Sequence, residues 1–261
     1  MSMTIAQIKK ILMREPTPQE LAFLASDNRE GVQKLLAVYE KKQQALTVEK
    51  MRFLQMCNYE NQLYEQGFKL LAGTDEAGRG PLAGPLVVAA AILPRDYFLS
   101  GLNDSKKLSA KKREELFAEI KSHAVSFSIQ IVSVEIIDAL NIYQATVQGM
   151  KDALLSLRPN PDAALTDAMP LKDLPFHTIT LVKGDSLSVS IAAASILAKV
   201  TRDRIMQELD EKYPQYGFAK HKGYGTKEHM DAIEKYGAIQ EHRKTFEPIK
   251  SLLNGVKPNE Y

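Results

Sequence analysis

The chain has 261 residues, of which 44% are hydrophobic and 25% are charged, as in an ordinary soluble globular protein. This length allows a substantial core in one large domain, or in one domain with an appendage. The net charge is only +2, so the overall field is too weak to identify a nucleic-acid partner. A single cysteine excludes an internal disulfide framework and a thiol-rich zinc site.

The sequence gives no sign of a membrane segment or an export signal. No stretch approaches about 18 consecutive apolar residues, which a membrane-spanning helix needs. The first fifteen residues carry Lys9, Lys10 and Arg14 among apolar residues and lack a continuous hydrophobic run. The lone Cys57 fits a reducing compartment. We therefore expect a cytoplasmic protein, and the balanced composition favours a monomer.

Residues 1–67 are expected to form a helical N-terminal extension. Thr17-Pro18-Gln19-Glu20 combines an N-cap threonine, a first-turn proline and a third-position glutamate, which together begin a helix. Apolar residues then recur at helical spacing over 32–39 and more loosely over 46–63.

From Phe68 onward, strands are expected to alternate with helices. The expected strands are 68–74, 85–93, 125–133, 163–167 and 177–183, and the expected helices are 109–122, 135–157 and 188–208. This order predicts an α/β domain over residues 68–250, with a mixed five-stranded sheet flanked by helices. The tail over 251–261 is expected to be loose.

Four carboxylates stand where the expected strands end. Asp75 and Glu76 end the first strand, Asp167 ends the fourth, and Asp185 follows the fifth. Because sites in open α/β sheets form just beyond strand ends, these groups can meet although they are distant in sequence. Hard oxygen ligands without cysteine or paired histidine favour Mg²⁺ or Mn²⁺ over zinc. For Asp167 alone, simple turn chemistry is the better interpretation.

A glycine-flanked arginine directly follows the first two acids. Gly78-Arg79-Gly80 is a bare, cationic backbone that can approach a phosphodiester closely. Neighbouring strand residues point to opposite faces, and the turn at Ala77-Gly78 would let both acids reach one cluster. The glycine spacing fits neither a P-loop nor a dinucleotide-binding fingerprint.

Taken together, these motifs resemble the bacterial ribonuclease HII family. The matching stretches, in the family's order over about residues 68–248, are Asp75 to Gly80, Asp104 to Leu108, Asp167, Lys183 to Asp185 with the helix that follows, His221 to Thr226, and Glu241 to Phe246. The resemblance implies a ribonuclease H-like fold and an endoribonuclease that cuts the RNA strand of RNA–DNA hybrids. It also implies nicking on the 5′ side of single ribonucleotides in duplex DNA, which leaves 5′-phosphate and 3′-hydroxyl ends.

The resemblance also assigns roles to individual residues. The catalytic and metal-binding residues would be Asp75, Glu76, Asp167 and Asp185. They would hold two Mg²⁺ or Mn²⁺ ions at the scissile phosphate, and without metal some should titrate abnormally high. The substrate-binding residues would be Gly78, Arg79, Gly80, Lys106, Lys107, Ser195 and Tyr224. The Gly-Arg-Gly loop would sense the 2′-hydroxyl in the minor groove, and Tyr224 would stack on the sugar at the RNA-to-DNA junction.

Simpler interpretations remain open for several of these residues. Lys106 and Lys107 could equally be a solvated pair before the next helix. For Ser195, a small residue that allows close helix packing is the better interpretation than a phosphate contact. His221 and His242 could assist binding or proton transfer, but without an evident partner we interpret both as loop histidines outside the catalytic set.

The N-terminal extension departs from the compact members of the family, which begin almost at the first strand. Ribonuclease HIII also carries an extension, but it is a sheet-containing platform, unlike the helical pattern of residues 1–67. We hypothesise that these helices add contacts to the duplex through Lys9, Lys10, Lys41 and Lys42.

Two other classes of protein fit parts of the pattern. A hybrid-binding module without catalysis would keep the fold but lose a carboxylate, whereas all four are present here. A phosphohydrolase acting on small molecules would also use a clustered acidic site. The scattered basic segments and the Tyr224 loop favour a polymeric substrate, but they do not exclude this alternative.

Overall fold

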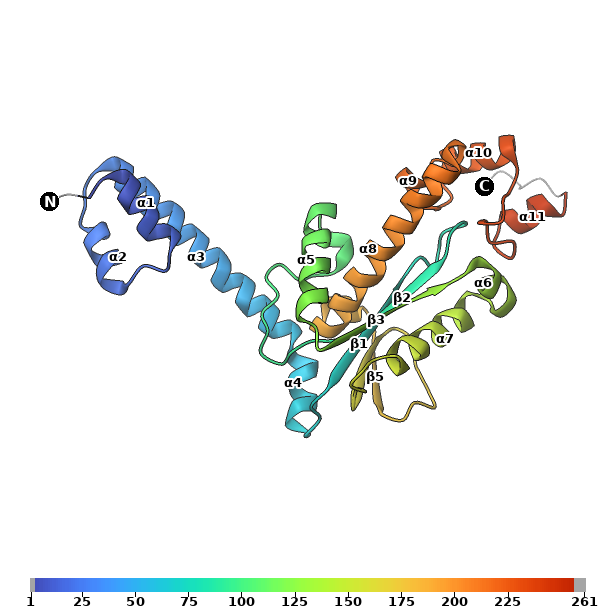
Figure 1. Ribbon diagram of the computed structural model, residues 1–261, viewed down its shortest axis with the longest axis horizontal. Helices are drawn as coiled ribbons and strands as arrows, with labels where there is room; N and C mark the ends of the chain where they lie inside the picture. Colours follow the sequence, from blue (N-terminus) through green and yellow to red (C-terminus); the bar gives the residue numbers. More distant parts are fainter. Residues whose placement is uncertain (1–2, 256–261) are drawn as a thin grey trace. The chain divides into compact units, whose positions relative to one another are not determined.

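The computed structural model describes residues 3–255 of the chain, which forms two compact units, Met1–Leu54 and Gln55–Tyr261. The division falls near the end of the long helix α3 (Glu30–Met56) (Figure 1). Helix α4 (Asn58–Glu65) therefore belongs to the second unit, although the sequence suggested a boundary after residue 67.

The first unit is helical, as expected. Helices α1 (Ile5–Met13) and α2 (Pro18–Ala25) each begin with a capping box, formed by Thr4 with Gln7 and by Thr17 with Glu20. In each box the threonine side chain accepts a backbone N–H while the third helical residue reaches back to the threonine N–H. The helix start predicted at Thr17 is thus confirmed.

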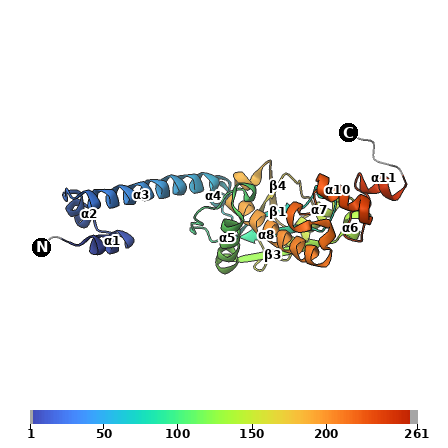
Figure 2. The ribbon, with the colours of Figure 1, turned by 90° about the horizontal axis from the view of Figure 1, so that it is seen from above.

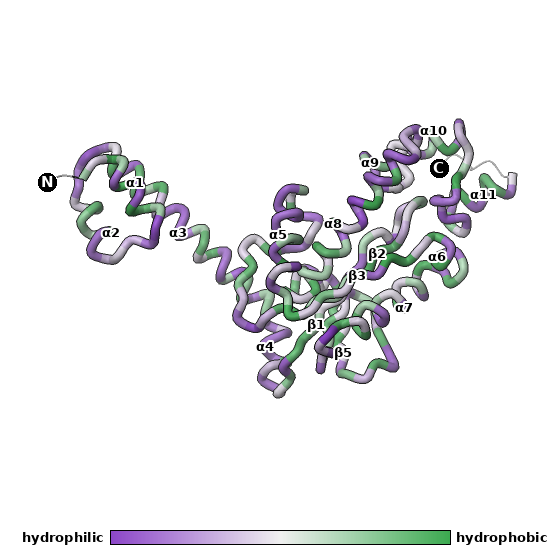
Figure 3. Tube along the Cα trace, in the orientation of Figure 1, coloured by the Kyte–Doolittle hydropathy of each residue, from purple (hydrophilic) through white to green (hydrophobic). Residues whose placement is uncertain are grey.

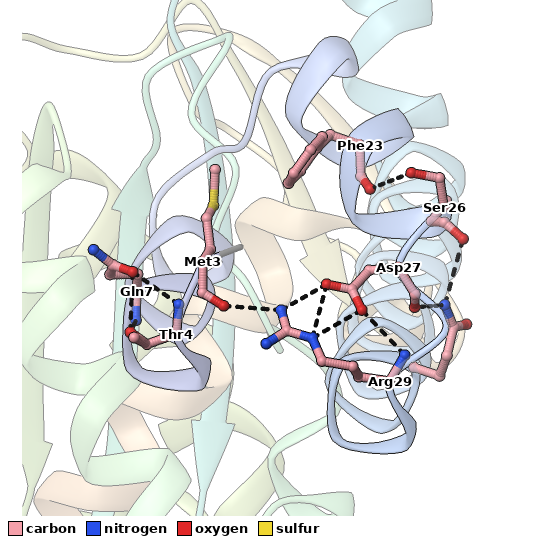
Figure 4. A network of polar contacts seen from close by, with 9 residues as sticks. Met3, Thr4, Gln7, Phe23, Ser26, Asp27 and Arg29 are labelled. Carbon is pink, nitrogen blue, oxygen red and sulfur yellow. Dashed lines mark hydrogen bonds and ion pairs between the residues drawn. The ribbon is translucent and has the colours of Figure 1, made fainter. Parts of the chain in front are cut away.

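A small core and one polar network hold the first unit together. The fully or nearly fully buried core residues are Ile8, Leu24, Val32 and Leu36. The Arg29 guanidinium binds the Asp27 carboxylate in the turn before α3 and donates to the Met3 carbonyl at 2.8 Å (Figure 4). Arg29 thereby ties the segment before α1 to the turn between α2 and α3.

The second unit is built on one mixed sheet of five strands. The strands are β1 (Leu71–Ala77), β2 (Leu86–Ile92), β3 (Ser126–Val132), β4 (Ala163–Asp167) and β5 (His177–Leu181). Their spatial order is β3-β2-β1-β4-β5. The β1–β2 and β2–β3 pairs are antiparallel, whereas the β1–β4 and β4–β5 pairs are parallel. The predicted α/β architecture is confirmed.

Helices cover both faces of this sheet. Helix α8 (Val189–Lys212) lies along one face and α7 (Ile142–Leu155) along the other (Figure 1). A Cβ on Gly73 of β1 would lie 2.1 Å from the backbone carbonyl carbon of Ser190, so only glycine lets α8 approach so closely. The opposite face packs apolar residues such as Val88 against α7. All seven residues of β2 are buried, and Figure 3 shows the apolar character of this part of the chain.

Three helices, and one interruption of an expected helix, were not predicted from the sequence. The helix expected over 135–157 is two helices, α6 (Val134–Leu140) and α7, because Asn141 adopts a positive φ and caps α7 through its side chain. After α8 come α9 (Phe218–His221), α10 (Lys227–Tyr236) and α11 (Ile249–Leu253), of which α10 and α11 are labelled in Figure 2. Helix α11 corrects the expectation of a loose tail from residue 251, and residues 256–261 lie outside the described part.

The remaining connections include short 3-10 turns and one amphipathic helix. The turns are η1 (Ser105–Lys107), η2 (Gly184–Ser186) and η3 (Pro214–Tyr216), and the helix is α5 (Ala110–His123). Over residues 3–255, every helix is too short or too polar to cross a bilayer.

Candidate active site

The first pair of expected site acids lies at the carboxyl ends of two adjacent parallel strands. The β1–β4 register pairs Thr74 with Thr166, and Asp75 and Asp167 each follow by one residue. Both residues share the strand face that packs against α8, by the alternation of side chains from Gly73 and Leu165. The sheet therefore brings together two acids that are 92 positions apart in sequence.

Asp185 reaches the same region from the loop after β5. The backbone N–H of Gly184 donates to Oδ1 of Asp167 at 2.6 Å, which fixes turn η2 beside the end of β4. Asp185, the next residue, is buried, and its Oδ2 lies 3.8 Å from Nζ of Lys106. Lys106 itself is largely exposed and approaches from η1. The ammonium group of Lys106 thus lies beside the acids on the side that faces solvent.

The side chain of Glu76 leaves β1 on the face opposite to Asp75, but it still lies near the other acids. Its Oε1 lies 3.5 Å from a guanidinium nitrogen of Arg79, and its side chain is mostly buried. Strand β1 continues to Ala77, and the chain then turns at Gly78, whose φ is +99°. The turn expected at Ala77-Gly78 is therefore present, although the strand itself runs three residues beyond its expected end at residue 74.

Burial makes these carboxyl groups difficult to ionise together. Burial raises the pKa of Asp75 well above its usual range, and the charges of Glu76 and Asp167 raise it further. Burial also raises the pKa of Glu76, against the opposing charge of Arg79. The pKa of Asp185 is raised by burial and by the neighbouring Asp104. A bound cation would relieve this repulsion.

The donor set fits a hard divalent cation. Oε2 of Glu76 is buried and has no hydrogen-bond partner, so it is an acceptor that still needs a donor or a cation. The other oxygens named above are carboxylate oxygens, the ligands that Mg²⁺ and Mn²⁺ prefer. As they stand, no three acidic, histidine or cysteine side chains over residues 3–255 converge into a ready-made metal cage. The Asp75 carboxylate already accepts the backbone N–H of Glu76 at 2.7 Å.

A cavity of about 290 Å³ opens over the acids and the arginine loop. Its lining residues are Asp75, Glu76, Ala77, Gly78, Arg79, Gly80, Ser105, Lys106, Ser195, Lys199, Arg202 and Tyr224. All the expected site residues line it except Asp167, Asp185 and Lys107. Lys107 lies instead 4.0 Å from Asp104 and is mostly exposed.

Two buried arginines hold the backbone of the Gly78–Pro85 loop. The guanidinium of Arg243 donates to the carbonyls of Gly78 at 2.6 Å, Arg79 at 2.9 Å and Gly84 at 2.9 Å. The guanidinium of Arg202 binds the carbonyls of Ala83, Pro85 and Lys222. Burial lowers the pKa of Arg202 to about 10 and that of Arg243 to about 9. With these carbonyls occupied, the loop has a fixed shape.

Tyr224 stands opposite this loop. Its ring is 49% exposed, and a Cβ on Gly80 would lie 3.7 Å from it, at ordinary contact distance. The N–H of Leu82 donates to the Gly223 carbonyl at 2.8 Å, which joins the two loops. A Cβ on Gly223 would lie 2.3 Å from the Ala83 carbonyl oxygen, so this contact requires glycine. Tyr224 is thus not a core tyrosine.

Ser195 and the two histidines singled out in the sequence are buried. Ser195 is 4% exposed; its hydroxyl lies 2.8 Å from that of Ser105 and hydrogen-bonds Asp75. His221 and His242 were expected in loops, but both are buried, His242 completely. His221 lies in α9, where no helix was foreseen, whereas His242 lies outside the helices, between α10 and α11.

Sequence reasoning missed Asp104, Lys199 and Arg202 as site residues. Asp104 lies beside Asp185. Lys199 and Arg202 line the cavity from α8. Asp104 stands in a loop rather than at a strand end, so the pattern that found the other acids does not apply to it. The cluster of cationic residues from Lys199 to Arg204, within the helix expected over 188–208, was the available signal for Lys199 and Arg202.

Comparison with known proteins gives a consistent assignment. The chain matches the model of the family described as Ribonuclease HII over residues 72–248, and that of the Ribonuclease HII N-terminal domain over residues 4–64. A Ribonuclease HII of Bacillus cereus is 51% identical over 252 residues, or 96% of this chain and 98% of the relative.

Solved structures of other proteins share the fold of this chain. The ribonuclease H2 from Pyrococcus horikoshii is 29% identical with a TM-score of 0.62, covering 73% of this chain and 100% of that chain. A Bst-RNase HIII in complex with Mn²⁺ is 19% identical with a TM-score of 0.55, covering 72% of this chain and 70% of that one, and supports the fold alone.

A mixed five-stranded sheet of this order, with acids at the ends of its central parallel strands, defines a ribonuclease H-like, metal-dependent hydrolase. The chain belongs to the ribonuclease HII family. The match to that family's N-terminal domain also separates the helical extension from the platform expected of ribonuclease HIII.

Proposed function

We propose that this protein nicks duplex DNA on the 5′ side of single embedded ribonucleotides and cuts the RNA strand of RNA–DNA hybrids. The products would be 5′-phosphate and 3′-hydroxyl ends. One observation carries the proposal: Asp75 at the end of β1, with Asp167 on the adjacent strand β4, borders a cavity that a cationic loop and an exposed tyrosine also line. A nuclease that recognises a sugar and cuts the adjacent phosphodiester bond needs an acidic, metal-binding site next to a sugar-binding loop.

Asp75, Glu76, Asp167 and Asp185 are the catalytic residues of this proposal. They would hold two Mg²⁺ or Mn²⁺ ions, which, when bound, activate water and stabilise charge on the leaving 3′ oxygen. The raised pKa values of Asp75, Glu76 and Asp185 and the unpartnered oxygen of Glu76 support a cation at this position. The choice between the two metals rests on ligand chemistry, which suits both.

The loop Gly78-Arg79-Gly80 would contact the ribonucleotide in the minor groove. Arg243 occupies the carbonyls of Gly78 and Arg79, so the backbone N–H groups of this loop and the Arg79 side chain, which also lies beside Glu76, are the parts that would meet a sugar or phosphate. Tyr224 would stack on the sugar at the junction, for which its half-exposed ring is suited.

Lys106 would contact a phosphate beside the acids, and its position 3.8 Å from Asp185 favours that role over a solvated face. Lys107, which does not line the cavity, would contact the backbone further away. Ser195 would act mainly on Asp75, through its hydroxyl, rather than on phosphate directly.

The N-terminal unit would add contacts to the duplex. Lys9, Lys10, Lys41 and Lys42 are exposed, and none of the four forms an ion pair with another residue of the described chain. Unpaired lysines contribute sequence-independent affinity for phosphates that falls as salt rises. The positive charge of these lysines complements the negative charge of a nucleic-acid backbone, which supports a nucleic-acid partner for the unit.

The decisive assay uses three substrates in Mg²⁺ or Mn²⁺: a DNA duplex with one ribonucleotide, an all-DNA duplex of the same sequence, and a small phosphomonoester. We expect cleavage of the first alone, and its loss in Asp185→Asn. Asp173→Asn is the matched control, because that carboxylate is exposed and lies outside the cavity. Binding without cleavage would indicate a non-catalytic module, and hydrolysis of the phosphomonoester would indicate a small-molecule phosphohydrolase.

A further inference from the structure

Three histidines form a buried stack beneath the Tyr224 loop. They are His221 in α9, His229 in α10 and His242 before the C-terminal turn. The ring centroids lie 4.5 Å apart between His221 and His229, and 5.3 Å apart between His229 and His242. His229 and His242 are fully buried. None of the three lines the cavity, so the chemistry proposed above does not use them.

The hydrogen bonds determine which nitrogen of each ring carries the proton. A carbonyl only accepts, so Nδ1–H of His229 donates to the Tyr224 carbonyl at 2.9 Å, and Nε2 of the neutral ring is an acceptor. Nδ1 of His242 accepts the N–H of Ile239 at 3.0 Å, so the proton of this ring is on Nε2. His242 therefore donates to Nε2 of His229 at 3.1 Å.

A directed chain of hydrogen bonds results, from Ile239 N–H through His242 and His229 to the Tyr224 carbonyl. The third ring is also fully engaged: Nε2 of His221 donates to the Tyr216 carbonyl at 2.7 Å, and Nδ1 accepts from Gly223 N–H at 3.2 Å. All six ring nitrogens thus have partners, and none is left to bind a metal.

The chain of hydrogen bonds ends at Tyr224, in the loop proposed to contact the substrate. The N–H of Tyr224 donates to the carbonyl of His221 at 2.9 Å, while its carbonyl accepts from the His229 ring and, at 2.8 Å, from the N–H of Thr226. The backbone of Tyr224 is therefore held on both sides by the histidine stack, and only its ring projects into the cavity. Small shifts of such a residue move the ring relative to Gly80.

We propose that His229, supported by His242, is a positioning residue that sets the Tyr224 ring for stacking on the substrate. The inference rests on the proposed function. Because the chain acts through Tyr224 and does not touch the acids, its loss should weaken substrate binding more than it slows the chemical step.

His229→Leu removes the side-chain donor to the Tyr224 carbonyl while keeping a similar volume, and His229→Asn keeps an N–H₂ near the position of Nδ1. On the duplex with one ribonucleotide, we expect His229→Leu to raise KM about fivefold or more with kcat changed less than about twofold. His229→Asn should restore most of the loss. In a Tyr224→Ala background, His229→Leu should change KM no further, which a general loss of stability would not produce.

An unchanged KM in His229→Leu, or an equal rise in the Tyr224→Ala background, would overturn the proposal. If His229→Leu does not fold, His242→Asn decides the same question, because it keeps an acceptor for Ile239 N–H but removes the donor to His229. Circular dichroism at the assay temperature identifies folded variants. Failure of the proposed function would be recognised separately, because the unchanged protein would then not nick the duplex. In that case the variants would be compared by their dissociation constants for the duplex instead of by KM.

Discussion

Glu60 of α4 accepts a hydrogen bond from the Ser188 hydroxyl at 2.5 Å, and this bond joins the end of the N-terminal extension to the first turn of α8. The same oxygen also accepts the backbone N–H of Ser190 at 3.0 Å. A carboxylate at a helix N-terminus satisfies otherwise unpaired N–H groups. Since Asp185 lies just before this turn, α4 supports the loop that carries one of the proposed catalytic acids.

Two truncations should therefore behave differently. Deleting residues 1–54 leaves Glu60 and the buried Leu63 in place and should keep the second unit folded. Deleting residues 1–67 removes both and should lower the free energy of unfolding by about 3 kcal/mol or more. Urea unfolding of the two proteins checks this. Equal stability of the two would show that α4 contributes nothing to the second unit.

The lysines of the first unit can be tested in the full chain. Changing Lys9, Lys10, Lys41 and Lys42 to glutamine should weaken duplex binding by about tenfold at low salt and reduce its salt dependence. The turnover of bound substrate should change little, because the acids are untouched. Fluorescence anisotropy at several salt concentrations measures the effect. An affinity and salt slope equal to those of the unchanged protein would exclude the proposed contacts.

The contacts made by Arg243 predict a large loss of stability on its removal. Arg243→Met keeps much of the apolar stem but leaves the buried carbonyl of Gly84 and the partly buried carbonyls of Gly78 and Arg79 without donors, which should cost about 3 kcal/mol or more. Arg158 also binds backbone carbonyls, at 2.6 and 2.7 Å, but it is exposed, so water can replace it. Arg158→Met should cost well under half as much in urea unfolding. Similar costs for the two changes would contradict the role of burial.

The buried histidines predict a specific dependence of stability on pH. Burial lowers the pKa of His229 and His242 to about 4, whereas both should titrate near 6.5 in the unfolded chain. Between those values the unfolded state binds more protons, so stability is complete above about pH 6.5 and falls as the pH drops towards 4. From about pH 7 to about pH 5 the loss should be about 2 kcal/mol per histidine.

Replacing both residues with glutamine should lower stability at neutral pH but flatten this slope. His177→Gln, at an exposed ring, is the control and should leave the slope unchanged. Urea unfolding at several pH values measures the slopes. If the double variant kept the full slope of the unchanged protein, the two histidines would not be its source.

The fold was predictable from local patterns. Each of the five strands was found within a few residues, because apolar runs and turn residues mark them in the sequence. The break at Asn141 was missed because both flanking segments have good helical patterns, and only its own positive φ separates them. The C-terminal helices were missed because α9 and α11 are short and lack a long periodic pattern.

The site was predictable only in part. Acids at strand ends could be found because parallel strands bring their ends together, as Asp75 and Asp167 illustrate. The partners of Tyr224 could not be found, since His229 and His242 become neighbours only when α10 and the C-terminal segment fold together. The same holds for Glu60, whose contact with Ser188 joins positions 128 residues apart. The roles of the site residues stay predictions.

The central claim is that the acids at the ends of β1 and β4 cut beside a ribonucleotide that the adjacent loops recognise. The most direct measurement maps the nick in an end-labelled DNA duplex with one ribonucleotide, in the presence of Mg²⁺ or Mn²⁺. We predict a single nick on the 5′ side of the ribonucleotide, with a 3′-hydroxyl end, and its loss in Asp185→Asn. A nick elsewhere, or equal cutting of the all-DNA duplex, would contradict the account.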